Sequence, residues 1–320
     1  MVHYIRLKKR RISQRGAGTK YYIDCSKYSE NADSIQPNTL IRNTNHVAIL
    51  KAVFTDNTPK KNKHIVVKIV RSNKGAAREF DIGQQLYDNK LIGFIKYTCL
   101  FSCYDNTNED NTEITAKGPA TKLDSKICQA EHNEKNLKQV IVMPYIQKGS
   151  IEDFAWNAGN VNILKNILVQ AVLSLSVAYD AIGFLHGDLH LGNILFKETK
   201  LTPVTYFSSN LGEITIETER HKVVIMDFEK SETHVEKSGI ANTSFWDNIY
   251  MMLNRVNTLS PNNGERLNWE DSEIIRFLRE AKKRKYPCIR EHIVRLHEMI
   301  ENSEFEFFAV REYKYLPNDL

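Results

Sequence analysis

The alternation of hydrophobic and polar positions in the first half of the chain predicts strands with one helix among them. Short apolar, β-branched runs at residues 47–54 and 65–70 flank the turn sequence D-N-T-P, which predicts a hairpin. Residues 76–86 place apolar side chains at helical spacing. Further strand is expected within 91–104, and a buried strand at 140–143.

The second half of the chain changes to a helical period. Apolar residues recur every three or four positions over 164–182, Gly183 follows as a helix stop, and the pattern is helical again from residue 245 to near the C-terminus. Short strands are expected at 194–196, 204–207, 213–216 and 223–226. A β-rich first part followed by a mainly helical second part predicts an α+β, bilobal fold.

We expect three regions along the chain. Residues 1–20 form a basic, flexible arm, 21–143 a β-rich N-terminal lobe, and 144–320 a mainly helical C-terminal lobe. The polar stretch near 105–136, which is rich in Asn, Thr, Lys and Glu, is expected to be a surface insertion in the first lobe.

Composition and charge narrow the class of protein only slightly. The chain has 320 residues, of which 42% are hydrophobic and 26% charged, with 14 Gly and 8 Pro, and this excludes collagen-like, low-complexity and wholly disordered proteins. The net charge of +5 suits a nucleic-acid binder or an enzyme that handles phosphates. Because residues 1–20 hold seven Lys and Arg and no acid, nucleic-acid binding is expected only through this arm.

The sequence predicts an intracellular, cytoplasmic protein. The basic residues near the N-terminus are not followed by the apolar core of a signal peptide, and the most apolar stretch, 163–185, is too polar to span a membrane. The five cysteines are scattered, without a zinc-finger spacing, and are expected to be reduced thiols. No membrane association is expected.

Two segments carry candidate chemistry. In H-G-D-L-H-L-G-N, which starts at His186, the carboxylate of Asp188 and the carboxamide of Asn193 stand five residues apart between a helix and a strand. In V-V-I-M-D-F-E, Asp227 comes just after a buried strand. Phosphoryl transfer needs a carboxylate to orient the attacking hydroxyl and oxygen ligands for Mg²⁺.

These two segments together resemble the catalytic loop and the metal-binding motif of the protein-kinase-like superfamily. The motifs H-G-D-L-H and D-F-E are most similar to those of aminoglycoside phosphotransferases and choline kinases. The segment 141–154, I-V-M-P-Y-I-Q-K-G-S-I-E-D-F, instead resembles the hinge of serine/threonine protein kinases. This combination of motifs from two kinase classes is similar to kinases encoded by large DNA viruses. The resemblance covers about residues 35–255.

The resemblance implies a kinase-like fold and roles for several residues. Asp188 would be the catalytic base, Asn193 and Asp227 the ligands of Mg²⁺, with Mn²⁺ as an alternative ion, and Lys68 would contact the α- and β-phosphates of ATP and pair with Glu79. Asn193 and Lys68 would thus be catalytic as well as cofactor-binding.

The resemblance also assigns the hinge and the rest of the loop. Met143 would line the back of the adenine pocket, and Pro144 and Ile146 would present their backbone to the base. Tyr145 would also belong to the ATP-binding residues. His186 would brace the loop, and His190 takes the place of the catalytic-loop lysine of protein kinases. Asp247 would anchor the loop from a following helix.

Several departures from the superfamily pattern leave the function open. No G-x-G-x-x-G precedes Lys68, Gly187 replaces an arginine, and no A-P-E motif appears. The 34-residue spacing from Asn193 to Asp227 implies an insertion near 197–222.

Three functions remain in competition. The first is a divergent protein serine/threonine kinase that binds ATP and a protein substrate. The alternatives are a small-molecule kinase acting on an alcohol, and a pseudokinase that serves as a scaffold or virion component. A viral protein of this kind would act in the host cytoplasm or the virion.

Overall fold

The computed structural model describes residues 35–43, 47–54, 63–70, 75–105, 128–129, 137–200, 203–259 and 265–309. The basic arm 1–20 and most of the polar stretch 105–136 therefore lie outside the described residues. Contacts divide the chain into two compact units. Unit 1 comprises residues 1–84 and 95–145, and unit 2 comprises 85–94 and 146–320.

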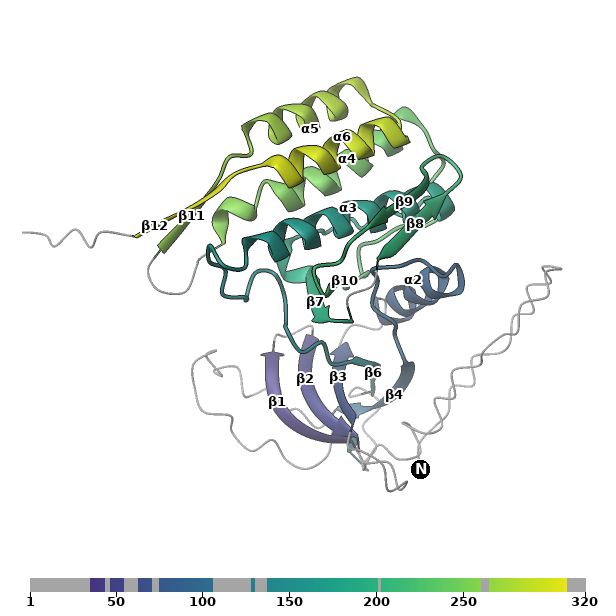
Figure 1. The fold of residues 1–320 in the computed structure, drawn as a ribbon. Coiled ribbons are helices and arrows are strands. Elements are labelled where there is room, and N and C mark those ends of the chain that lie inside the picture. The colour runs from purple at the N-terminus through teal and green to yellow at the C-terminus, as the bar shows by residue number, and fades with distance from the viewer. Residues whose placement is uncertain are drawn as a thin grey trace, which may run out of the picture. The chain divides into compact units, whose positions relative to one another are not determined.

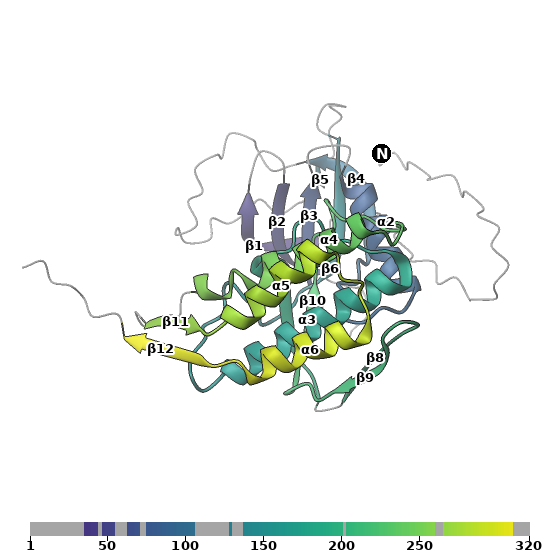
Figure 2. The ribbon, with the colours of Figure 1, turned by 90° about the horizontal axis from the view of Figure 1, so that it is seen from above.

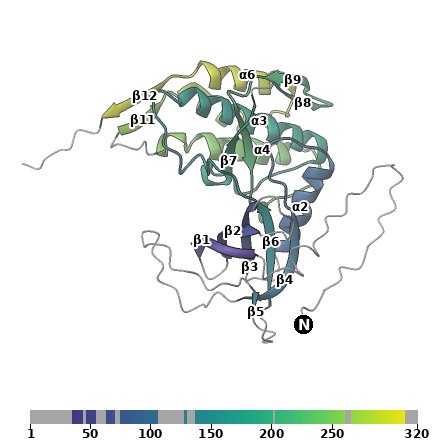
Figure 3. The ribbon, with the colours of Figure 1, turned by 60° about the horizontal axis from the view of Figure 1, so that its bottom comes forward.

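Unit 1 contains an antiparallel sheet (Figure 3). Its strands run in the order β1 (Ile35–Asn43), β2 (Val47–Phe54), β3 (Lys63–Val70), β6 (Leu137–Pro144), β4 (Cys99–Asp105) and β5 (Cys128–Gln129). The β2–β3 hairpin is confirmed, with Val47 opposite Val70 and Phe54 opposite Lys63. Alternate residues of these strands form one buried apolar cluster, as the two-residue period of a strand requires: Ala48, Leu50, Ala52, Ile65, Val67, Ile69, Cys99, Val140 and Val142.

The segment between the predicted helix and β4 is only partly a strand. Helix α2 (Ala76–Asp88) is confirmed, but the expected strand within 91–104 begins only at Cys99. Gly93 has a φ of +89°, a conformation that breaks a strand, and a Cβ at this position would collide with Ser174. The buried residues Ile95 and Tyr97 lie in an irregular segment, which sequence pattern alone does not distinguish from a strand.

Unit 2 is built on four helices that lie side by side (Figure 2). They are α3 (Val161–Ile182), α4 (Gly239–Leu253), α5 (Ser272–Arg284) and α6 (Arg290–Asn302). The predicted helix stop at Gly183 is confirmed: its φ is +61°, and its N–H bonds to the carbonyls of Ala178 and Tyr179.

Helix α3 is the core of unit 2. Among the described residues it alone is long and apolar enough to cross a membrane by length and hydropathy, and 72% of that apolar window is buried inside the protein. A helix that is apolar on most sides and buried on most sides is the usual centre of a helical unit.

Short antiparallel pairs complete unit 2 (Figure 1). They are β7 (Ile194–Glu198) with β10 (His221–Ile225), β8 (Val204–Ser208) with β9 (Gly212–Ile216), and β11 (Glu265–Trp269) with β12 (Phe305–Ala309). Two short 3₁₀ turns, η3 (Leu191–Asn193) and η4 (Val256–Thr258), also belong to it.

The expectation of a helical pattern from residue 245 to near the C-terminus is therefore wrong for β11 and β12. These two strands pair across about forty residues of chain, and a local pattern does not reveal such pairing. The expectation of reduced cysteines holds for Cys288, which is free and buried, and is wrong for Cys99, which belongs to a disulfide.

Candidate functional site

The pairing of β7 with β10 brings the two motifs of unit 2 together. Ile194 lies opposite Ile225, so the residues just before β7 and just after β10 meet at one end of this two-stranded ribbon. The backbone N–H of Met226 donates to the carbonyl of Asn193 at 3.0 Å. Asn193 and Asp227 are thereby placed near one another by backbone structure, as the metal-binding hypothesis requires.

His186 braces the catalytic loop from inside. Its ring is fully buried, and its Nε2 lies 3.0 Å from the carbonyl of Met226. Its Nδ1 accepts a hydrogen bond from the backbone N–H of Asp188 at 3.4 Å. Burial lowers the pKa of His186 below its usual 6.5, so the ring is neutral at pH 7 and donates through Nε2 while it accepts through Nδ1.

Asn193 and Asp227 present oxygen atoms suited to a hard divalent cation. The amide nitrogen of buried Asn193 donates to the carbonyl of Asp188 at 3.0 Å, which leaves the amide oxygen as its ligand atom. Asp227 has a φ of +68°, a left-handed backbone conformation that non-glycine residues adopt rarely and that is frequent at functional sites.

The aromatic ring after Asp227 holds this loop in place. Phe228 is fully buried and makes edge-on contacts with Phe184 and His186, with ring centroids 5.9 and 6.0 Å apart. A buried aromatic side chain next to the carboxylate limits the directions in which Asp227 can point.

The donor set fits Mg²⁺ bound together with a nucleotide. Within the described ranges, no group of three or more His, Cys, Asp or Glu side chains could hold a metal by itself. Mg²⁺ in phosphoryl-transfer sites is usually bound by one or two carboxylates plus substrate phosphates and water. Asn193 and Asp227 match that requirement.

Asp188 is accessible and ionised. Its side chain is 43% exposed, and Nζ of Lys230 lies 2.8 Å from its Oδ2. The hydrogen bond from Lys230 lowers the pKa of Asp188 below its usual value, and partial burial opposes this shift. The carboxylate is therefore charged at neutral pH and able to accept a proton.

The loop 186–193 is anchored by Asn248 and not by Asp247. The Oδ1 of Asn248 accepts the backbone N–H of Gly187 at 2.9 Å, whereas Asp247 forms an ion pair with Lys282. Both residues lie in α4, where neighbouring side chains point about 100° apart. The expectation that Asp247 anchors the loop is therefore wrong, and the next residue in the chain takes this role.

The hypothesis that this loop carries out phosphoryl transfer predicts that truncating its anchor impairs that reaction. Asn248→Ala removes the acceptor of the Gly187 N–H, and we expect kcat to fall by roughly 10- to 100-fold, since small displacements of a catalytic group are costly. Asn248→Asp keeps an acceptor oxygen and should restore most of the rate. Asp247→Ala is the matched control and should leave kcat unchanged, and a larger loss in this control than in Asn248→Ala would contradict the assignment.

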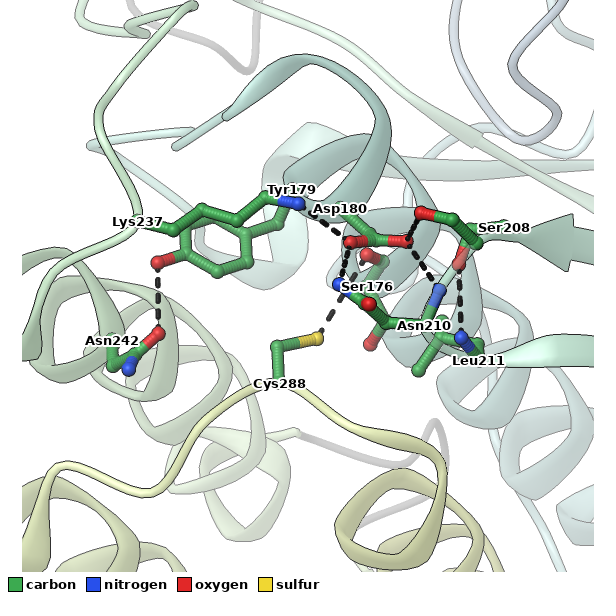
Figure 4. A network of polar contacts seen from close by, with 10 residues as sticks. Ser176, Tyr179, Asp180, Ser208, Asn210, Leu211, Lys237, Asn242 and Cys288 are labelled. Carbon is green, nitrogen blue, oxygen red and sulfur yellow. Dashed lines mark hydrogen bonds and ion pairs between the residues drawn. The ribbon is translucent and has the colours of Figure 1, made fainter.

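A buried carboxylate fixes the segments on either side of the metal motif to α3 (Figure 4). Asp180 accepts hydrogen bonds from Ser209 Oγ at 3.0 Å and from the backbone N–H of Asn210 at 2.9 Å, and it pairs with Lys237 at 2.6 Å. Burial raises the pKa of Asp180, but these donors outweigh it and hold the pKa at about 2. The β8–β9 hairpin and residue 237 are thereby held in place by one charged group.

In unit 1, Lys68 and Glu79 form a buried ion pair. The atoms Lys68 Nζ and Glu79 Oε2 are 2.7 Å apart, with side chains 3% and 1% exposed. The other carboxylate oxygen accepts a hydrogen bond from Tyr97 Oη at 2.6 Å. A lysine held in this way presents a fixed positive charge of the kind that contacts nucleotide phosphates. The sequence predicted the pair but not its tyrosine partner.

Breaking this pair should destabilise unit 1. Glu79→Gln keeps an acceptor for Tyr97 but removes the carboxylate charge that lies 2.7 Å from the buried Lys68 ammonium, so we expect a loss of about 3–5 kcal/mol in the free energy of unfolding. The double variant Lys68→Met/Glu79→Gln removes both charges and should recover most of that loss in urea unfolding. A double variant at least as unstable as the single one would contradict the account.

The predicted hinge residues lie at the end of β6 and just beyond it. Met143 and Ile146 are buried, and the Lys51 ammonium lies 4.1 Å from the centroid of the Tyr145 ring. Residues 44–46, which separate β1 from β2 in the chain and where kinases would carry a glycine-rich loop, lie outside the described residues. Lys230, Asn248 and Asp180 were not found by sequence reasoning, because each is defined by a partner at least 29 residues away in the chain.

Comparison with known proteins gives one family match and one relative. The model of the haspin-like kinase domain matches residues 24–250, about seven tenths of the chain. The serine/threonine-protein kinase haspin of Mus musculus is 37% identical to this chain over 90 residues. That stretch covers 28% of this chain and 12% of the mouse protein. The α+β kinase-like fold expected from the sequence is confirmed by the family match.

Proposed function

Because the chain belongs to the haspin-like kinase family, we propose that it is a protein serine/threonine kinase. It would transfer the γ-phosphoryl group of ATP to a hydroxyl of a protein substrate. The observation that carries the proposal is the loop of unit 2, where an ionised Asp188 stands beside the oxygen ligands Asn193 and Asp227.

Each group of this site has a defined task in the proposed reaction. Asp188 accepts the proton of the acceptor hydroxyl as its oxygen bonds to the γ-phosphorus, and the bond from that phosphorus to the β–γ bridging oxygen breaks, leaving ADP. Asn193 and Asp227 would hold Mg²⁺, which neutralises charge on the phosphates when bound. Lys68, fixed by Glu79, would bind the α- and β-phosphates, and the hinge residues Met143, Tyr145 and Ile146 the adenine.

The H-G-D motif of the loop does not by itself favour a small-molecule substrate. Gly187 has a φ of +75°, and a Cβ at this position would collide with the carbonyl oxygen of Lys230. The glycine is therefore explained by close packing of two backbone segments. This leaves the hinge resemblance and the family as the guides to a protein substrate.

A substrate panel tests the proposal. Purified protein is incubated with Mg²⁺ and γ-labelled ATP, with basic and acidic proteins in one set and with choline and aminoglycosides in the other. We expect label in protein hydroxyls and none in the small alcohols. Label in a small alcohol alone would support the alternative enzyme class, and nucleotide binding in a thermal-shift titration without any transfer would support a pseudokinase scaffold.

A further inference from the structure

The transferring phosphoryl group needs a positive charge that the catalytic loop of this chain does not itself supply. H-G-D-L-H-L-G-N contains neither lysine nor arginine, and His190 stands where protein kinases carry a lysine. The Nδ1 of His190 accepts the backbone N–H of Gly192 at 3.2 Å, which makes this ring the N-cap of the turn η3. That nitrogen is used for local structure.

Lys230, three residues after Asp227, brings a positive charge to the same place. Its ammonium nitrogen lies 2.8 Å from Oδ2 of Asp188, the proposed base. The two residues are 42 positions apart in the chain, and they meet because the segment after the metal motif folds back along the catalytic loop.

The backbone around Lys230 is held tightly against that loop. Leu185 and Glu232 exchange two backbone hydrogen bonds, at 2.9 and 2.8 Å. Fully buried Ser231 donates its hydroxyl to the carbonyl of His186 at 2.8 Å. The close packing of Gly187 on the carbonyl of Lys230 adds a further contact. The position of the Lys230 Cα is thus set by the fold, and only its long side chain is free to move.

The ion pair itself contributes little to folding. The side chains of Lys230 and Asp188 are 64% and 43% exposed, and ion pairs this accessible are usually worth about 1 kcal/mol or less. A tightly placed backbone carrying an exposed cation beside the proposed base is better explained by a ligand than by stability. The ligand must be anionic and must come next to Asp188, which describes the phosphoryl group in transfer.

We propose that Lys230 is a catalytic residue whose ammonium group binds the γ-phosphoryl group of ATP, in the role that the loop histidine does not fill. The proposal rests on the proposed kinase function and extends it. When the nucleotide is bound, the ammonium exchanges part of its contact with Asp188 for a γ-phosphate oxygen. It then stabilises the charge on the group as the acceptor oxygen bonds to phosphorus and the proton passes to Asp188.

The test measures nucleotide affinity as well as turnover. Dissociation constants of Mg·ATP and Mg·ADP are measured by calorimetry for the full chain, for Lys230→Met and for Lys283→Met, an exposed lysine of α5 that serves as control. We expect Lys230→Met to weaken ATP binding about tenfold and ADP binding hardly at all, since a charge-assisted hydrogen bond to the γ-phosphate alone is lost. We expect kcat to fall by roughly 10²- to 10³-fold, the usual loss for one preorganised donor.

A second comparison separates contact with phosphate from screening of Asp188. In an Asp188→Asn background, Lys230→Met should still lower the ratio of ATP to ADP affinity, because the ammonium acts on the phosphate directly. If the ratio changes only when Asp188 is charged, Lys230 merely screens that carboxylate and the proposal is overturned.

The remaining outcomes are equally decisive. The assignment is overturned if Lys230→Met leaves the ratio of ATP to ADP affinity unchanged, or if the wild type does not distinguish ATP from ADP. It is also overturned if kcat rises in Lys230→Met, because the ion pair of Lys230 with Asp188 would then be inhibitory. If Lys230→Met changes the ratio of ATP to ADP affinity while the wild type shows no turnover, the γ-phosphate contact is supported and the proposed kinase function is refuted. The two proposals can therefore fail separately.

Discussion

Asp227→Ala should reduce phosphoryl transfer to background while the protein stays folded. Asp227 is one of two proposed Mg²⁺ ligands and the only carboxylate of the two, so its removal leaves the neutral amide oxygen of Asn193 as the remaining proposed ligand. The left-handed backbone of Asp227 is more costly for Ala than for Asp, by about 1 kcal/mol. Asp227→Asn is therefore the companion variant, because Asn tolerates this conformation and removes only the charge.

Initial rates at saturating Mg²⁺ and urea unfolding check this prediction. Both variants should be inactive, and Asp227→Asn should unfold at the same urea concentration as the wild type. Near-wild-type turnover of either variant would show that Asp227 does not bind the metal.

Asp188→Asn should lower kcat by about 10²- to 10⁴-fold, the range typical of a positioned general base. The substitution keeps the shape of the side chain and an oxygen atom for Lys230, but it removes the charge and the proton acceptor. Because Asp188 is not assigned to nucleotide binding, the affinity for Mg·ATP should change little.

Calorimetry with Mg·ATP and single-turnover rates separate the two effects. Glu291→Gln, an exposed carboxylate in α6, is the matched control and should behave as the wild type. A loss confined to ATP affinity, with kcat retained, would remove Asp188 from the catalytic role.

The local helices and strands were largely predictable because their apolar residues recur at clear helical or strand spacing. The buried β2–β3 hairpin, the 22-residue apolar helix α3 and its stop at Gly183 each follow from spacing and residue type. Their boundaries, and the pairing of β11 with β12, depend on contacts between distant segments, which spacing does not encode.

The candidate site was predictable as motifs but not as a geometry. Asp188, Asn193 and Asp227 could be singled out because the two segments that contain them together resemble motifs of the protein-kinase-like superfamily. The identity of the loop anchor depends on which of two neighbouring side chains in α4 points towards Gly187, and a helix turns by about 100° between them. The contact of Lys230 with Asp188 could not be predicted from the sequence either, since the two residues lie 42 positions apart in the chain.

The measurement that tests the account most directly is a single-turnover experiment on the full chain. Protein in excess over γ-labelled ATP is mixed with Mg²⁺ and a protein acceptor, and the transfer of label is followed for the wild type and for Asp188→Asn in parallel. The account predicts transfer to hydroxyl side chains of the acceptor in the wild type, slowed at least about 10²-fold in the variant. Bound ATP that stays intact in the wild type, or equal rates in both proteins, would contradict it.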